Sequence, residues 1–274
     1  IDQIKLANGA NTFNIGANDE AKLSGVSIVG NSGVDTFIYT SAVLTNGTTN
    51  AILIGSGGND VLQITGSTSV NDTNLSGFTG INTLNLNSYT GSIVLGSDAM
   101  AMGLTTIDAS GNAGILSINA SAMSSGVTIK SATVGGSTYT GSNSATTDVL
   151  TIGSAITQDA SAITKIETIN VNANTTFTGN ITGVSNLSIA SSRTLNLDAS
   201  ALSNDTMSIA DAGTLVINNA SSTTQLNGLT FTGAGALQVN GTSSNDTITL
   251  NSTLTSYTGT ITLNGGAGDD IIVG

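Results

Sequence analysis

The sequence contains no cysteine, proline, histidine or tryptophan, and four Tyr and five Phe are its only aromatic residues in a length of 274. Without cysteine and histidine, the chain can form no disulfides, carry out no thiol or imidazole catalysis, and offer few zinc ligands. The scarcity of rings excludes a large core packed around aromatic side chains. No apolar run approaches the roughly 18 residues of a transmembrane helix, so membrane insertion is not expected.

Charge is also scarce, at 8% of residues, and five Lys and Arg face 17 Asp and Glu for a net charge of −12. A chain without a basic patch is a poor partner for nucleic acid or an anionic membrane. The acidic pairs Asp19–Glu20 and Asp269–Asp270 are adjacent in sequence, whereas a glycosidase needs carboxylates opposed across a cleft. The cations that an enzyme could use are scattered: Lys5, Lys22, Lys130, Lys165 and Arg193. We therefore expect no enzymatic activity.

What the chain does contain is Gly, Ser, Thr and Asn, interleaved with Ile, Leu and Val. The apolar residues alternate with polar ones at period two in short runs such as 83–86, 194–197 and 260–263, each bounded by Gly, Asn, Asp or Ser. Such runs are typical of short β-strands and argue against disorder. Helical turns are suggested only at 97–104 and, more weakly, at 159–166. The sequence predicts an all-β protein.

The predicted strands recur with a rhythm. One series is centred near residues 169, 188, 208, 230 and 249, and a second lies near 177, 196, 216, 238 and 262. About two strands per ~20-residue coil are what a β-solenoid of the parallel β-helix type needs. A β-sandwich is the main alternative, but the even spacing and the missing proline favour the solenoid. We expect a single elongated segment over 1–274, with a potential sub-boundary near 65–80, cut from a longer secreted protein.

Two short repeats accompany the strands. An aromatic-Thr-Gly tripeptide occurs at residues 78–80, 89–91, 139–141, 177–179, 231–233 and 257–259. Its rings could form a row for carbohydrate stacking or fill the corners of the coils. The irregular spacing favours the corners. An apolar-Asx-Ala-Ser repeat predicts an Asx hydrogen bond that closes a strand. It begins at Ile107, Ile118 and Leu197, with a relaxed copy at 219–221.

One sequence motif is typical of metal binding. Residues 265–273 fit all fixed positions of G-G-x-G-x-D-x-U-x, the calcium-binding nonapeptide of RTX proteins. Residues 55–63 and 30–38 fit except at the second place, where Ser56 and Asn31 stand, and residues 241–249 keep the Asp and apolar places but lose the middle Gly. Glycines allow left-handed turns that aim carbonyls at a hard cation, and the Asp adds a carboxylate.

The motif predicts bound Ca²⁺. The candidate ligands are Asp35, Gly55, Gly57, Asn59, Asp60, Asp246, Gly265, Gly266, Gly268, Asp269 and Asp270. Since calcium takes six to eight oxygens, a neighbouring coil must complete each site. The alternative is a plain Asx-Gly turn without an ion. The aspartates that lack the glycine frame are predicted to be solvated loop residues: Asp72, Asp148, Asp205 and Asp211.

With these nonapeptides, its composition and stretches such as 80–86 and 106–110, the chain resembles RTX-type bacterial surface-layer (S-layer) proteins. The resemblance implies a fold related to the RTX β-roll, type I secretion through a signal outside this segment, and a location at the cell surface. It also implies self-assembly into a calcium-dependent two-dimensional lattice, with attachment to cell-surface polysaccharide through other regions. The nonapeptides here are isolated, whereas RTX proteins carry them in tandem arrays.

Two binding functions compete with this interpretation. A calcium-stabilised segment of a large RTX adhesin would share the export route and composition, but adhesin domains usually repeat nearly identically, and these coils diverge. An ice-binding solenoid needs a regular Thr-x-Thr face, and Thr-Ile-Thr-Leu occurs only at 247–250 and 260–263. A structural lattice subunit remains the favoured prediction.

Overall fold

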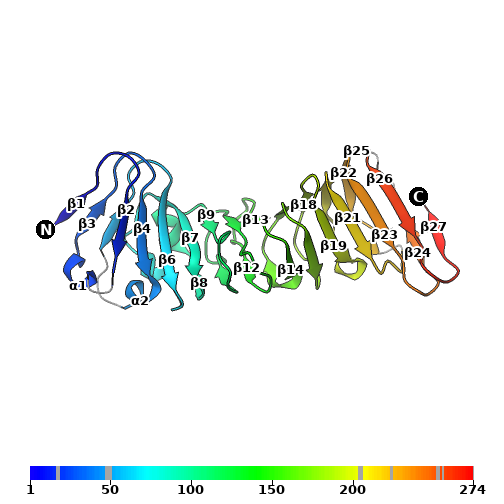
Figure 1. The fold of residues 1–274 in the computed structure, drawn as a ribbon, viewed down its shortest axis with the longest axis horizontal. Coiled ribbons are helices and arrows are strands. Elements are labelled where there is room, and N and C mark those ends of the chain that lie inside the picture. The colour runs from blue at the N-terminus through cyan, green and yellow to red at the C-terminus, as the bar shows by residue number, and fades with distance from the viewer. Residues whose placement is uncertain are drawn as a thin grey trace. The chain divides into compact units, whose positions relative to one another are not determined.

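The protein is nearly all β and forms a solenoid of about 12 turns built from stacked parallel sheets, as predicted. The computed structural model describes residues 1–16, 19–46, 51–202, 206–222, 225–250, 254 and 256–273. The chain divides into two compact units (Figure 1), unit 1 with Ile1–Thr133 and Ser137–Asp148, and unit 2 with Val134–Gly136 and Val149–Gly274. The sub-boundary suggested near 65–80 falls inside unit 1.

In unit 1, three series of parallel strands run from coil to coil. The longest contains β2 (Thr12–Ile15), β4 (Thr36–Thr40), β6 (Asp60–Gly66), β7 (Ile81–Tyr89), β9 (Thr106–Asp108) and β11 (Thr128–Lys130). The others are β1 (Gln3–Lys5), β3 (Ser27–Val29) and β5 (Ile52–Ile54), and then β8 (Ser92–Val94), β10 (Ser117–Asn119) and β12 (Thr138–Thr140). Short helices lie at the corners: α1 (Glu20–Leu23), α2 (Ser41–Leu44), η1 (Asp72–Leu75) and α3 (Ser97–Met102).

In unit 2, two series line the coils. The first contains β13 (Val149–Ile152), β16 (Thr168–Val171), β18 (Asn186–Ile189), β20 (Ser208–Asp211), β22 (Thr230–Gly233) and β25 (Ser256–Tyr257). The second contains β14 (Ile156–Asp159), β17 (Thr175–Thr178), β19 (Thr194–Asp198), β21 (Thr214–Asn218), β23 (Ala236–Asn240) and β26 (Thr260–Asn264). The remaining elements are β15 (Ile163–Thr164), the pair β24 (Thr247–Thr249) and β27 (Ile271–Val273), η2 (Ala160–Ala162) and η3 (Ala199–Leu202).

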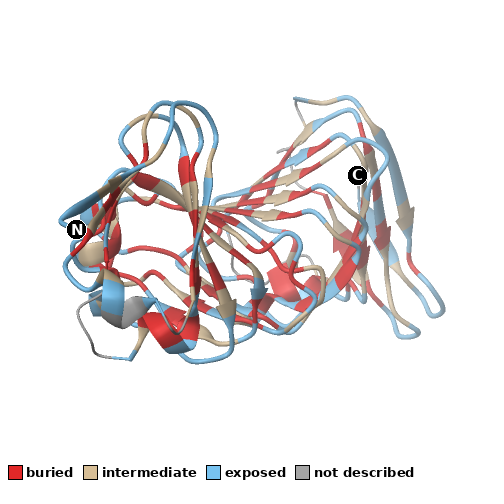
Figure 2. Ribbon diagram, turned by 60° about the vertical axis from the view of Figure 1, so that its left-hand side comes forward, coloured by how far each residue is buried: buried red, intermediate tan, exposed pale blue. Residues whose placement is uncertain are grey.

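Figure 2 shows buried residues recurring along the strands of successive coils. These residues are mostly aliphatic, and those of neighbouring strands pair in register to form the core. In unit 1 this column contains Phe37, Leu62, Leu84, Ile107 and Ile129, each 0% exposed. In unit 2 it contains Leu150, Ile169, Leu187, Ile209 and Phe231, none more than 2% exposed. Each such side chain contributes about 1.5–3 kcal/mol on burial, so stacking alone explains how few aromatics suffice.

The predicted rhythm is correct for most strands, but the coils differ in length. Thr36 pairs with Val61 in unit 1, 25 residues later, whereas Thr168 pairs with Asn186 in unit 2, 18 residues later. The strand expected near residue 249 as the successor of β22 was misassigned. β24 pairs with β27 instead, and β22 continues to β25, because the chain inserts an additional turn before it returns to that sheet.

The outward face of the longest unit 1 series carries one column of β-branched residues, namely Thr12, Thr36, Val61, Thr83, Thr106 and Thr128. Such side chains suit a pleated, half-buried surface. The next outward column is mixed, with Asn14, Ile38, Gln63, Asn85, Asp108 and Lys130. The two Thr-Ile-Thr-Leu runs lie on strands of different sheets, β24 and β26, and form no common face.

Candidate metal centre

The aspartates of the nonapeptides lie buried at the corner where each coil enters its first strand. Asp35 and Asp60 in unit 1 are 0% exposed, and Asp246 in unit 2 is 2% exposed. Each stands at the beginning of a strand or directly before it, after a glycine-containing turn that folds back beside the side chain. The turn therefore brings the carboxylate inside the stack, where it meets main-chain groups of the neighbouring coil.

In unit 1 these carboxylates bridge successive coils through main-chain donors. Asp35 Oδ1 accepts hydrogen bonds from the Asn11 N–H at 2.8 Å and the Asn11 side-chain amide at 2.7 Å, and its Oδ2 accepts from the Asn31 N–H at 3.1 Å. Asp60 Oδ1 accepts from the Asp35 N–H at 2.7 Å. We call the Asp or Asn at this corner of a coil the ladder position; Asn11, Asp35 and Asp60 occupy it in the first coils of unit 1. Each step satisfies a buried N–H, which would otherwise cost about 1–3 kcal/mol.

Unit 2 repeats this geometry at its own nonapeptides. Asp246 Oδ2 accepts from the Thr242 N–H at 2.6 Å, and the Asp246 N–H donates to Asp270 Oδ1 at 3.0 Å. Asp270 is half-buried, whereas Asp269 is exposed, and its N–H donates to Asn245 Oδ1 at 2.9 Å. Of the two adjacent carboxylates, only that of Asp270 occupies the ladder position.

One aspartate of the same type lacks the glycine frame. Asp148 is 0% exposed; its Oδ1 accepts from the Val127 N–H at 2.6 Å and its Oδ2 from the Ser142 N–H at 2.8 Å. The prediction that Asp148 and Asp211 are solvated was therefore wrong, since Asp211 is only 1% exposed. Asp72 is half-buried and accepts main-chain hydrogen bonds at the start of α3, and Asp205 lies outside the described residues.

A sequence signal could have found Asp148, but not Asp211, which precedes Ala212. An Asp or Asn directly before a β-branched strand residue occurs at every ladder position, namely at residues 11–12, 35–36, 60–61, 148–149, 246–247 and 270–271. The glycines were the more conspicuous part of the pattern, but the buried carboxylate or amide is what the coil corner requires. Glycine allows the left-handed backbone of the turn, and the Asx side chain forms the hydrogen bonds between coils.

The turn glycines take the conformations that the motif predicts. The fourth place has a left-handed backbone at Gly33, Gly58 and Gly268, with φ of +116°, +111° and +116°. At the second place, Gly266 has φ of +98°, and Ser56 adopts the same region with φ of +85°. A non-glycine residue there is strained, since the left-handed region brings its Cβ close to a carbonyl oxygen.

Asp60 differs from Asp35 and Asp246 in one respect. Its Oδ2 is buried without a hydrogen-bond partner among the described residues, whereas the corresponding oxygens of Asp35 and Asp246 accept an N–H from the second residue of their own turns. The left-handed backbone at Ser56 accompanies the loss of this bond. Burial raises the pKa of Asp60, and repulsion from Asp35 adds to the effect, while the Asp35 N–H opposes it.

A backbone carbonyl faces the same point. A Cβ built on Gly55 would collide with the Gly80 carbonyl oxygen and with Asp60 Oδ2, so these two oxygens converge beside a position without a side chain. Gly241 is placed in the same way between the Gly265 carbonyl and Asp246 Oδ2. Oxygen donors of this kind suit a hard cation such as calcium. The residues at Asp60 therefore fit the ion that the motif implies.

The other predicted ligands are distributed around these corners. Gly55 and Gly265 are buried at the points of closest approach, Gly57 is half-buried, and Asn59, Gly266 and Gly268 are exposed. Within the described residues, no group of three or more His, Cys, Asp or Glu side chains converges. An ion at these corners would therefore depend on main-chain carbonyls for most of its ligands.

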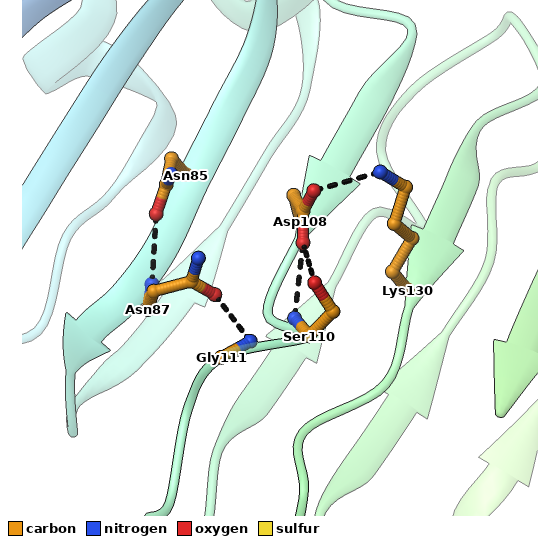
Figure 3. A network of polar contacts seen from close by, with 6 residues as sticks. All are labelled: Asn85, Asn87, Asp108, Ser110, Gly111 and Lys130. Atoms are coloured by element: carbon orange, nitrogen blue, oxygen red, sulfur yellow. Dashed lines mark hydrogen bonds and ion pairs between the residues drawn. The ribbon is translucent and has the colours of Figure 1, made fainter. Parts of the chain in front are cut away.

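The outer surface carries a second, exposed type of Asx contact. In the apolar-Asx-Ala-Ser repeats, Asp108, Asn119 and Asp198 accept the N–H of the serine two residues later at 3.0, 2.9 and 2.9 Å, as predicted. Figure 3 shows that Asp108 also pairs with Lys130 at 2.8 Å, which lowers the Asp108 pKa despite partial burial. In the relaxed copy the Ser221 N–H donates to Gln225 instead, at 2.7 Å.

The aromatic-Thr-Gly repeats form no exposed row of rings for carbohydrate stacking, but the prediction that their rings fill coil corners is wrong for Tyr139, Phe177 and Phe231, which lie within β12, β17 and β22. Five of the six rings are at most 2% exposed: Phe78, Tyr89, Tyr139, Phe177 and Phe231. In the three Phe copies the glycine has a positive φ, whereas in two of the Tyr copies, at Gly91 and Gly259, it makes room for the tyrosine's own hydroxyl. Glycine thus serves two different purposes in one tripeptide.

No family model matches this chain, and no curated protein or solved structure is significantly similar to it. Among the described residues, no helix is both long and apolar enough to cross a membrane.

Proposed function

We propose that this chain is a structural subunit of a secreted bacterial surface layer, which self-assembles into a calcium-dependent two-dimensional lattice. The observation that carries the proposal is the pair of stacked, buried carboxylates Asp35 and Asp60 at a glycine-lined corner of a parallel β-solenoid, with one carboxylate oxygen left unpartnered. Such a corner is suited to holding an ion between coils, and the surrounding solenoid is suited to presenting a rigid surface.

Calcium would be held at two corners. In unit 1, Asp60 and the Gly80 carbonyl would bind it, with Asp35 in the adjacent coil, and in unit 2 the Asp246–Asp270 pair and the Gly265 carbonyl would do so. The ion supplies positive charge between carboxylates that otherwise repel one another. The chain's own residues set the spacing, because the ladder hydrogen bonds fix each carboxylate relative to the next coil.

Charge explains why an ion would control assembly. A protein of net charge −12 resists self-association, because its like-charged surfaces repel. Bound cations cancel part of that charge and stiffen the coils, which lowers the ordering cost of each contact between subunits. In a sheet the same weak contact repeats many times, so a modest gain per subunit decides between monomer and lattice.

Electron microscopy of the full-length protein with calcium and with a chelator tests this function. The informative variant combines Asp60→Asn with Asp270→Asn, and its charge-matched control combines Asp2→Asn with Asp19→Asn, both exposed positions. We expect ordered sheets from the wild type and the control with calcium, and none from the corner variant at limiting calcium. Normal sheets from the corner variant would overturn calcium control, and failure of the wild type to form sheets would favour the adhesin alternative.

A further inference from the structure

The four nonapeptide turns fall into two classes by the backbone of their second residue. In the turns that begin at Gly30 and Gly241, the second residue is Asn31 or Thr242, and neither has a left-handed backbone. Their N–H groups donate to Oδ2 of the aspartate four residues later, at 3.1 and 2.6 Å. In these two turns the chain's own main chain occupies the carboxylate oxygen.

The other two turns have a left-handed residue at the second place. Ser56 has φ of +85°, and Gly266 has φ of +98°. The Gly266 N–H donates to Asn264 Oδ1 at 3.2 Å, and Asp60 Oδ2 has no hydrogen-bond partner within the described part of the chain. Since φ is the rotation about the bond between the main-chain nitrogen and Cα, a change of its sign turns the N–H relative to the rest of the turn. The backbone at the second place therefore determines whether the carboxylate oxygen is free.

Ser56 is the informative member of the second class, because it is not glycine. Asn31 stands at the same place in the preceding coil, and asparagine enters the left-handed region more readily than serine does, yet only Ser56 is left-handed. The side chain of Ser56 is exposed, so its packing does not force this conformation. Backbone strain of this kind is concentrated at functional sites, which makes Ser56 a candidate for a functional role.

The oxygen that Ser56 leaves free is buried beside a second oxygen. Asp60 is 0% exposed, and a Cβ on Gly55 would lie 2.3 Å from Asp60 Oδ2 and 2.1 Å from the Gly80 carbonyl oxygen. Two oxygen atoms that carry negative charge repel one another, and a cation between them would reverse the sign of the interaction. An ion that binds here displaces no hydrogen bond from Asp60 Oδ2.

The corner at Asp246 has the same carbonyl but not the same free oxygen. A Cβ on Gly241 would lie 2.7 Å from Asp246 Oδ2 and 2.0 Å from the Gly265 carbonyl oxygen. Asp246 Oδ2, however, accepts both the N–H and the hydroxyl of Thr242, at 2.6 and 3.0 Å. A carboxylate oxygen has two lone pairs, so both are in use at this corner. An ion that binds there must first displace Thr242.

We propose that Ser56 opens the Asp60 corner to calcium, and that this corner binds calcium more tightly than the corner at Asp246, which Thr242 closes. The inference rests on the proposed function for the identity of the ion. It deepens that function by naming the residue at the second place as the one that sets the affinity of each corner, and hence the order in which the corners fill.

Reciprocal substitutions in the full chain test the inference. Ser56→Thr copies the closed turn into unit 1, because a β-branched side chain disfavours the left-handed backbone and its hydroxyl can donate as that of Thr242 does. Thr242→Gly copies the open turn into unit 2. Ser56→Gly is the matched control, since it keeps the left-handed backbone and removes only an exposed side chain.

Calcium titrations followed by NMR measure the affinities, and the amide signals of Asp60 and Asp246 report the two corners separately. We expect Ser56→Thr to weaken calcium binding at Asp60 by about tenfold or more, and Thr242→Gly to strengthen it at Asp246 by a similar factor, because each change makes or removes a hydrogen bond that the ion must displace. Ser56→Gly should bind at least as tightly as the wild type. Equal affinity of the wild type and Ser56→Thr at Asp60 would overturn this inference alone. A wild type that binds no calcium would overturn the proposed function and this inference with it.

Hydrogen exchange in chelator gives a second measurement that needs no ion. If the backbone at the second place controls the oxygen, the N–H of residue 56 should exchange about tenfold more slowly in Ser56→Thr than in the wild type, because it then donates to Asp60 Oδ2. In Ser56→Gly the exchange should stay as fast as in the wild type. Unchanged exchange in Ser56→Thr would show that Ser56 does not determine whether this oxygen is free.

Discussion

Asp60 in unit 1 and Asp211 in unit 2 are buried to the same degree, yet their neighbours differ. Asp60 faces the N–H and the charge of Asp35, with a carbonyl beside its unpartnered oxygen, so a cation would relieve its environment. Asp211 accepts hydrogen bonds from the Tyr257 hydroxyl and the Gly213 N–H, so hydrogen-bond donors, not a second carboxylate, lie beside it. The difference teaches that burial alone does not assign a role to a carboxylate in a solenoid; the residues of the adjacent coils do.

The largest effect should come from closing the unit 1 corner with a methyl group. Gly55→Ala places a Cβ against the Gly80 carbonyl and Asp60 Oδ2. The stacked backbone of the two coils cannot easily shift to relieve this contact. We expect a loss of about 3 kcal/mol in the free energy of unfolding, measured by denaturant titration. Gly153→Ala is the matched control, because nothing lies within 4 Å of the added methyl group. Equal effects of the two substitutions would contradict the close approach at the corner.

Removing the unit 1 carboxylate should cost less. Asp60→Ala leaves the buried Asp35 N–H without an acceptor, so we expect a loss of about 2 kcal/mol in chelator, by denaturant titration. Asp60→Asn keeps an acceptor oxygen and removes the repulsion with Asp35, so its stability in chelator should stay near that of the wild type. Asp269→Ala, at an exposed position, should change stability by less than about 0.5 kcal/mol. If the free energy of unfolding of Asp60→Ala equals that of the wild type, the ladder hydrogen bonds contribute nothing to stability.

Changes of calcium and pH should distinguish the contribution of Asp60 to stability from that of Asp211. Both have raised pKa values, so each contributes stability below the ordinary aspartate pKa that is lost as the pH rises through its folded pKa. The loss is about 1.4 kcal/mol for each pH unit between the unfolded and the folded pKa. Thermal unfolding across pH in chelator should show both losses. Calcium should raise the melting temperature and remove the Asp60 loss, while the Asp211 loss remains until Asp211→Asn abolishes it. Identical pH profiles with calcium and with chelator would refute an ion at the Asp60 corner.

For aspartates with lowered pKa values, the change of stability with pH has the opposite sign. Asp108 and Asp198 contribute stability above the ordinary aspartate pKa, and it is lost as the pH falls through their lower folded values. A smaller effect than at the buried corners is expected from the exposed ion pair of Asp108 with Lys130, whose side chain is 47% exposed. Lys130→Ala should cost less than about 1 kcal/mol by denaturant titration and less still in high salt. A larger loss would mean that this surface network stabilises the coils as much as the buried corners do.

Much of the fold is encoded locally. Alternation in runs such as 194–197 predicted strands that the structure contains, and the run at 97–104 predicted the helix α3. The second strand series near 177–262 was placed within one residue of the observed register, because those coils are nearly equal in length. The strand near residue 249 was misassigned, because a coil of different length moved it to another sheet. Local pattern determines which residues form strands, whereas coil length determines which strands meet.

By itself the sequence determined the all-β solenoid, the left-handed glycine turns and the candidate corners at Asp35, Asp60 and Asp246. Only the tertiary structure decided that Asp148 and Asp211 are buried and that Tyr257 reaches Asp211. The physical reason is that a strand's own residues set its alternation, whereas a buried polar group is satisfied by groups one or two coils away. Those partners are 21 to 46 residues distant in the sequence, and only stacking brings them within hydrogen-bond reach.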